Sequence, residues 1–153
     1  TPRGRIWGHA GQVALLGVDA GGRLSPVARR SLRRTAQVVP LDGADALHLD
    51  RGALSTVDLR GRASSEARRG PGFTFESLLD ARAGVAAFIV RDAAGPALAL
   101  TDLRGERVLG FVRNERGVFS GALSPDGRRL AVRYEATGVE VFEREPETVT
   151  PPG

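Results

Sequence analysis

Cysteine, lysine and methionine are all missing from the 153 residues of this chain. Without cysteine the chain can form no disulfide bond, no thiolate metal site and no cysteine nucleophile. Histidine is nearly as scarce, because only His9 and His48 are present. His48 lies between Leu47 and Leu49, as a residue on one face of a strand does. We therefore expect no metal site and no cofactor.

Long apolar runs are missing as well. No stretch approaches the ~18 consecutive apolar residues that a membrane-spanning helix requires. The opening residues, 1–5, are polar, and no apolar stretch follows them, so this segment does not read as a signal peptide. These observations predict a cytoplasmic protein without a membrane partner.

Every one of the 22 basic residues is an arginine, which gives a formal net charge of +4 against 18 acidic residues. The arginines are spread along the chain and interleaved with Asp and Glu, whereas a nucleic-acid site usually gathers them on one stripe. Abundant Ala, Gly, Arg, Val and Leu with a single Asn are typical of a GC-rich genome. We therefore attribute the arginine excess to codon supply and disfavour a nucleic-acid partner.

What the sequence does contain is a repeat. Short apolar runs end four times at an acidic residue, and these residues are Asp19, Asp58, Asp102 and Glu143. They follow one another at spacings of 39, 44 and 41 residues. A period of about 40–45 residues is that of a four-stranded propeller blade.

The last repeat is the clearest. Its turn is Ser124-Pro125-Asp126-Gly127, in which Pro presets φ, Asp can cap its own turn and Gly takes the left-handed conformation. Residues 139–143 then alternate apolar and polar, the pattern of a half-buried strand.

The order of these features resembles that of the WD-repeat family of β-propellers. A blade of that family has an apolar strand, a Ser-Pro-Asp-Gly turn, a second apolar strand and a third strand that ends in Trp-Asp. Phe142 and Glu143 stand in the Trp-Asp position, and Asp19, Asp58 and Asp102 hold the same place in the other units. The histidine-containing structural tetrad of the family is not carried over, because Gly8-His9 lies in another register.

The resemblance implies an all-β fold, a β-propeller segment of four-stranded antiparallel blades. Units at about 4–34, 35–70, 71–116 and 117–150 give about three and a half blades. Incomplete blades at both ends imply further blades outside the segment or a second chain that supplies them, as in a homo-oligomer. The alternative is a four-bladed ring in which the N-terminal strand completes the last blade. Expected strands are 5–9, 13–18 and 23–29, with the first strand of that unit missing; 35–41, 46–49, 54–59 and a weak 62–68; 73–79, 85–91, 97–103 and 107–112; and 118–123, 130–134, 139–143 and a weak 148–150.

Candidate partner contacts are the single Trp7, the single Tyr134 and the basic pair Arg33 and Arg34. Exposed aromatic and arginine side chains often anchor a protein partner. The alternative for Trp7 and Tyr134 is packing between blades, and for the arginines a solvated edge. No residue is a candidate catalytic group, because the sequence holds no Gly-x-Ser-x-Gly, and Ser124 is explained by its turn.

The sequence therefore predicts a non-catalytic protein–protein interaction or scaffold module, of the kind the resemblance implies for bacterial propeller proteins. The alternative is a propeller enzyme or ligand binder with its site in the central channel, such as a hydrolase or lactonase. That alternative requires carboxylates or histidines at the starts of the innermost strands.

Overall fold

The structure is a computed structural model that describes residues 5–9, 12–31, 36–41, 45–58 and 66–145. In this part of the chain the only regular secondary structure is β-strand, with no helix among the described residues. The strands are β1 (Arg5–His9), β2 (Gln12–Val18), β3 (Leu24–Ser31), β4 (Gln37–Pro40), β5 (Asp45–Asp50), β6 (Ala53–Asp58), β7 (Thr74–Arg82), β8 (Val85–Asp92), β9 (Gly95–Asp102), β10 (Val108–Arg113), β11 (Val118–Leu123), β12 (Arg129–Tyr134) and β13 (Val139–Glu143).

The strands form four antiparallel sheets in chain order. Three of them have three strands, β1-β2-β3, β4-β5-β6 and β11-β12-β13, and the remaining one has four, β7-β8-β9-β10. Each strand pairs with the next one along the chain, so every sheet is a meander. The prediction of an all-β fold made of successive antiparallel sheets is confirmed.

Three expectations about strands need comment. Residues 75–82, which could also have formed helical turns, belong to strand β7. The sequence predicts that β1 is the second strand of its unit. In the structure β1 contacts β4, and β4 in turn contacts β7, the first strand of the next sheet. β1 is therefore the first strand of its sheet. Of the two weak outer strands, 62–68 is described only at residues 66–68, where Arg68 forms an isolated bridge with Leu54. The other, 148–150, lies outside the described residues.

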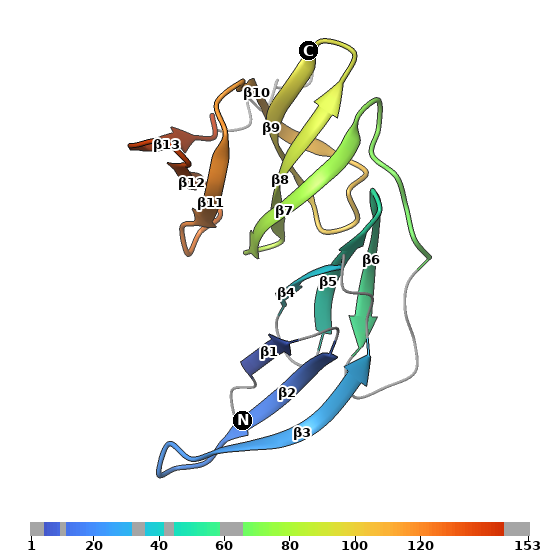
Figure 1. Cartoon of the computed structure of the whole chain (residues 1–153), viewed down its shortest axis with the longest axis vertical. Helices are drawn as coiled ribbons and strands as arrows, with labels where there is room; N and C mark the ends of the chain where they lie inside the picture. The colour runs from blue at the N-terminus through green and yellow to red at the C-terminus, as the bar shows by residue number, and fades with distance from the viewer. Residues whose placement is uncertain (1–4, 10–11, 32–35, 42–44, 59–65, 146–153) are drawn as a thin grey trace, which may run out of the picture.

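The sheets lie against one another through their first strands. β4 contacts β7, and β7 contacts β11, so that sheet β7–β10 has β4–β6 on one face and β11–β13 on the other (Figure 1). The middle strands of this sheet, β8 and β9, are apolar along most of their length, as strands buried on both faces are.

One core fills each of these two interfaces. Toward β4–β6, Phe88, Val90 and Ala86 pack with Leu47 and Leu54. Toward β11–β13 the alternate residues of β8 and β9 pack on the last sheet, namely Val85, Ala87, Leu98 and Leu100 against Leu123, Leu130, Val132 and Tyr134. The alternation along β8 is the period of two that a strand imposes on its side chains.

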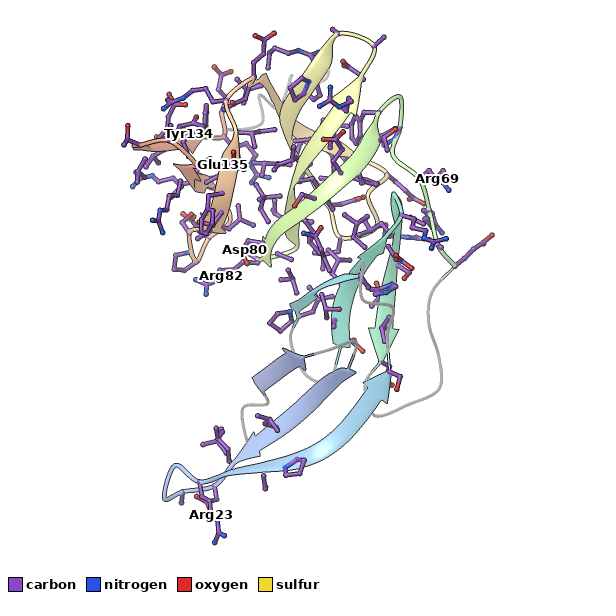
Figure 2. The ribbon with its side chains drawn as sticks, in the orientation of Figure 1. Arg23, Arg69, Asp80, Arg82, Tyr134 and Glu135 are labelled. Carbon is purple, nitrogen blue, oxygen red and sulfur yellow. The ribbon has the colours of Figure 1, made fainter. Side chains whose placement is uncertain are left out.

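Side-chain hydrogen bonds also join neighbouring first strands. Gln37 on β4 donates to the Ser77 hydroxyl at 3.0 Å and accepts from the Leu78 N–H at 2.8 Å. Asp80, near the end of β7 that faces the last sheet (Figure 2), accepts from the Leu123 N–H of β11 at 2.7 Å. These bonds fix how far one sheet slides along the next, which apolar contact alone does not specify.

We predict that Leu47→Ala lowers the free energy of unfolding by about 2 to 5 kcal/mol, because it leaves a cavity in the core between two sheets. Leu47 is 0% exposed, whereas Leu24 is 50% exposed and makes the matched control. Leu24→Ala should change the free energy of unfolding by less than about 0.5 kcal/mol. Urea denaturation followed by circular dichroism measures both, and equal losses would contradict the assignment of this core.

Candidate binding groove

Two of the repeated acidic residues, Asp19 and Asp102, bind the turns that follow their strands. Asp19 accepts hydrogen bonds from the backbone N–H groups of Gly21 and Arg23, both at 2.9 Å. Asp102 does the same after β9, for Glu106 at 2.9 Å and Arg107 at 3.4 Å. A carboxylate that satisfies two turn amides is a structural group, and this explains why an acidic residue recurs at these strand ends.

The Ser124–Gly127 turn is built as its sequence predicts. The Ser124 hydroxyl donates to Asp126 at 2.6 Å and accepts from the Arg129 N–H at 3.0 Å. Hydrogen bonds from Ser124 and from the Arg128 N–H lower the pKa of Asp126. Pro125 is exposed at the tip, and Gly127 has a φ of 72°, the left-handed conformation that favours glycine.

The remaining repeat positions lie at strand ends. Asp58 closes β6 and faces Asp45 of β5 in register. Phe142 is half-buried and packs against the core beside the last sheet, whereas the exposed Glu143 lies 3.9 Å from the Arg129 guanidinium. Phe142 therefore adds apolar contacts to this core, and its assignment as a repeat position stays a prediction.

Tyr134 is not an exposed partner contact, which corrects one of the two interpretations considered for it. The side chain is 3% exposed and packs in the core. Its hydroxyl donates to Glu140 at 2.6 Å and accepts from Asn114 at 2.9 Å, while the Arg116 guanidinium lies 3.6 Å from the ring centre. Burial, followed by the bond to Glu140, raises the pKa of Tyr134.

The other three candidate contacts stay predictions. Trp7 lies on β1, but its side chain lies outside the described residues, as do Arg33 and Arg34 entirely. Several described arginines have acidic partners: Arg113 makes two bonds of 2.9 Å to Asp92, Arg91 binds Glu76 at 2.6 Å, and Arg68 pairs with Glu106. The bonds with Arg113 lower the pKa of Asp92.

An apolar groove opens between the outer strands of the last two sheets. Its volume is about 210 Å³, and its lining comes from β9, β10, β12, β13 and the residue that follows β13. The side chains of Leu98, Leu100 and Val112 line one wall, and those of Leu130 and Phe142 line the other. The volume is below the ~300–1,000 Å³ of small-molecule sites. It is large enough for one side chain.

Gly110 keeps this groove open. It lies on β10 opposite Leu100, and a Cβ placed on it would meet the Leu100 side chain at 3.5 Å or more. The space that a larger side chain would occupy therefore belongs to the groove. Glu143 and Arg144 also line it, and they add one charge of each sign.

An open strand edge borders the groove. Among the described residues, β13 pairs only with β12, whereas the third strand of the neighbouring sheet, β9, pairs with strands on both sides. The backbone N–H and C=O groups on the free side of such a strand can pair with an added strand. Among the described residues, an apolar pocket therefore lies beside an unpaired strand edge.

Sequence reasoning identified Phe142 and Glu143 as repeat positions and missed that they line a groove. It did not single out Leu98, Leu100, Gly110 or Val112. The one available signal was the sequence of strand β10, Val-Leu-Gly-Phe-Val. This strand has no polar residue on either face over these five positions, although it is the outer strand of its sheet. An outer strand without a polar face indicates a surface that something covers.

Within the described ranges, no group of three or more His, Cys, Asp or Glu residues lies close enough to hold a metal ion. The first strands of three sheets begin at Gln37, Thr74 and Val118. None of these residues is a carboxylate or a histidine, which an enzyme or ligand site in the central channel would require there. The same ranges hold no helix long and apolar enough to cross a membrane.

No protein-family model matches the chain, and no curated protein matches it. Solved structures do. The Cps50 (Swd1) β-propeller domain of Myceliophteria thermophila is similar at a TM-score of 0.63 and 12% identity, with 99% of this chain and 53% of that chain covered. Hsv2 of Kluyveromyces lactis is similar at a TM-score of 0.58 and 11% identity, and the match covers 95% of this chain and 46% of that chain. Prolyl oligopeptidase B of Galerina marginata is similar at a TM-score of 0.56 and 11% identity, and the match covers 88% of this chain and 22% of that chain.

These likenesses define the class of fold. The chain has the fold of part of a β-propeller, with WD-repeat-like order in its strands and turns. It spans about half the length of the first two propeller chains, 53% and 46%. At identities of 11–12% the likeness concerns fold and not activity.

We predict that stability falls as the pH rises above 10.0, the ordinary pKa of tyrosine. Since the pKa of Tyr134 is raised in the folded chain, its contribution is complete below 10.0 and is lost as the pH rises through the folded value. The chain has one Tyr and no Lys or Cys, and Arg stays charged, so little else titrates there. Urea denaturation across this pH range should show a decrease that Tyr134→Phe lacks. Identical pH profiles for the two proteins would contradict it.

Proposed function

We propose that this chain is a non-catalytic protein-interaction module that binds an extended, acidic segment of a partner protein in the groove between β10 and β13. The observation that carries the proposal is the groove itself: an apolar hollow for one side chain beside a free strand edge. The walls of the groove belong to two sheets that pack on a shared core, so a preformed groove would lose little entropy on binding.

The geometry supports a specific mode of binding. A segment that adds to β13 would pair its backbone with that edge and would turn alternate side chains toward the groove. A leucine or phenylalanine among them would lie against Leu98, Leu100 and Phe142. Burying such an anchor in a desolvated pocket is the usual source of most binding free energy.

The charge of the chain supports an acidic segment. The formal net charge is +4. Beside the groove, Arg128 and Arg144 add positive charge, whereas Arg129 lies 3.9 Å from Glu143, which also lines the groove. Such charges raise the rate of association with an acidic partner and select against a basic one. The cytoplasmic location expected from the sequence remains part of this proposal. The channel enzyme or ligand binder stays a prediction, since no described feature favours it.

A phage-displayed library of random peptides tests the proposal with the chain immobilised. We expect enriched peptides that combine acidic residues with an alternating apolar pattern. Gly110→Val fills the groove without adding charge, and it should raise the Kd of a synthetic enriched peptide about tenfold or more. Val108→Leu also enlarges a β10 residue, outside the groove lining, and should leave the Kd unchanged.

Three results would contradict the proposal. The first is a library without enriched peptides, and the second is an enriched peptide that binds wild type and Gly110→Val equally well. The third is retention of the chain on duplex DNA at moderate salt, which would favour a nucleic-acid site instead.

A further inference from the structure

The last sheet has a second face, and it is exposed and partly apolar. Val139 and Val141 on β13 and Phe119 on β11 are 70%, 60% and 67% exposed. In register, Val139 and Val141 lie beside Arg133 and Ala131 of β12. Because neighbours along a strand point to opposite faces, this side is the reverse of the one that packs on the third sheet.

This face continues the stack at the point where the described sheets end. The second and third sheets, and the third and fourth, bury a core between them. The corresponding surface beyond the last sheet carries three of the most exposed large apolar side chains in the described part of the chain. Apolar side chains gathered on one face of this kind mark an interaction surface.

The composition of the face indicates a contact between molecules. β12 alternates, so that Leu130, Val132 and Tyr134 face the core while Arg129 and Arg133 point outward. The Arg133 guanidinium lies 5.1 Å from the centre of the Phe119 ring. Arginine and aromatic side chains together are enriched in protein–protein interfaces.

We propose that this end face binds the first sheet, β1–β3, of a second copy of the chain. The first strands follow the order β1, β4, β7, β11, in which each contacts the next. Placing β1 of a second copy beside β11 continues that order. The reciprocal contact, between β11 of the second copy and β1 of the first, closes a ring of two chains with twofold symmetry.

Two observations favour this occupant. The chain spans 53% and 46% of the length of two propeller chains that it resembles, so two copies supply the length of one such propeller. In addition, strand β2 is apolar at consecutive positions, Val13-Ala14-Leu15-Leu16. Such a run is typical of a strand in a sheet that is covered on both faces. Among the described residues of one copy, the first sheet contacts the sheet β4–β6, between β1 and β4.

Light scattering after size exclusion tests the proposal on the 153-residue chain. The expected mass is twice the 16.2 kDa of one chain. The double variant Val139→Glu, Val141→Glu should run as a folded single chain, because it places charges in the interface and both side chains are exposed within one copy. Val108→Glu, an exposed β10 valine away from this face, should leave the mass doubled.

Cross-linking shows which surfaces meet. The chain has no cysteine, so single-cysteine variants react at one place only. Ser120→Cys is on β11, opposite Arg133 and therefore on the end face, and Ile6→Cys is on β1. A short bis-maleimide should join one variant to the other in a mixture and should not join Ser120→Cys to itself.

Each other outcome overturns the proposal. A wild-type mass of one chain at all concentrations would mean that the face stays open or is covered by further sheets of a longer polypeptide. Growth beyond two chains would rule out the closed ring. A doubled mass in the Val139→Glu, Val141→Glu variant would place the contact on another surface. Cross-linking of Ser120→Cys to itself would mean that the two end faces contact each other. Circular dichroism of the double variant separates loss of association from loss of folding.

Discussion

Burial of apolar sheet faces against one another is the constraint on which this structure depends. A sheet of three or four strands has two faces, and one sheet alone leaves both in water. The third sheet solves this on both sides, since Phe88 and Val90 of β8 point to one neighbour and Val85 and Ala87 to the other. Each square ångström of apolar surface removed from water contributes about 25 cal/mol. The stack forms because no member is stable by itself.

Polar groups then decide how the sheets are aligned. Gln37 and Asp80 each bind a backbone N–H of the neighbouring first strand, and these bonds are directional where apolar contact is not. Because the sheets meet through their first strands, the outer strands of neighbouring sheets are free to separate. The groove between β10 and β13 follows from this arrangement.

The sequence predicted much of the fold. Asp19, Asp102 and the Ser124–Gly127 turn are local signals, because their carboxylates and the Ser124 hydroxyl accept hydrogen bonds from backbone amides within a few residues of themselves. Strand periodicity is local too, and it located nearly all the described strands. The position of β1 was missed, since it depends on a contact with β4 that no local pattern encodes.

The candidate groove was less predictable for the same reason. Leu98 and Val112 meet Leu130 and Phe142 only after two sheets have packed. The aromatic ring of Tyr134 could have been a surface anchor or a core group by sequence. Its burial follows from Asn114 and Glu140, which satisfy the hydroxyl from two different segments. Sequence patterns report the faces of strands, whereas pockets between sheets arise from tertiary packing.

Amide hydrogen exchange measures the central claim most directly, because it reports the stability of each strand separately. If the third sheet is held from both sides, the amides of β8 and β9 should exchange most slowly. The amides of β3 and β13, at the open edges of the first and last sheets, should exchange much faster. Exchange of β8 as fast as that of β13 would contradict the account, since it would mean that the stacking of sheets does not hold the molecule together.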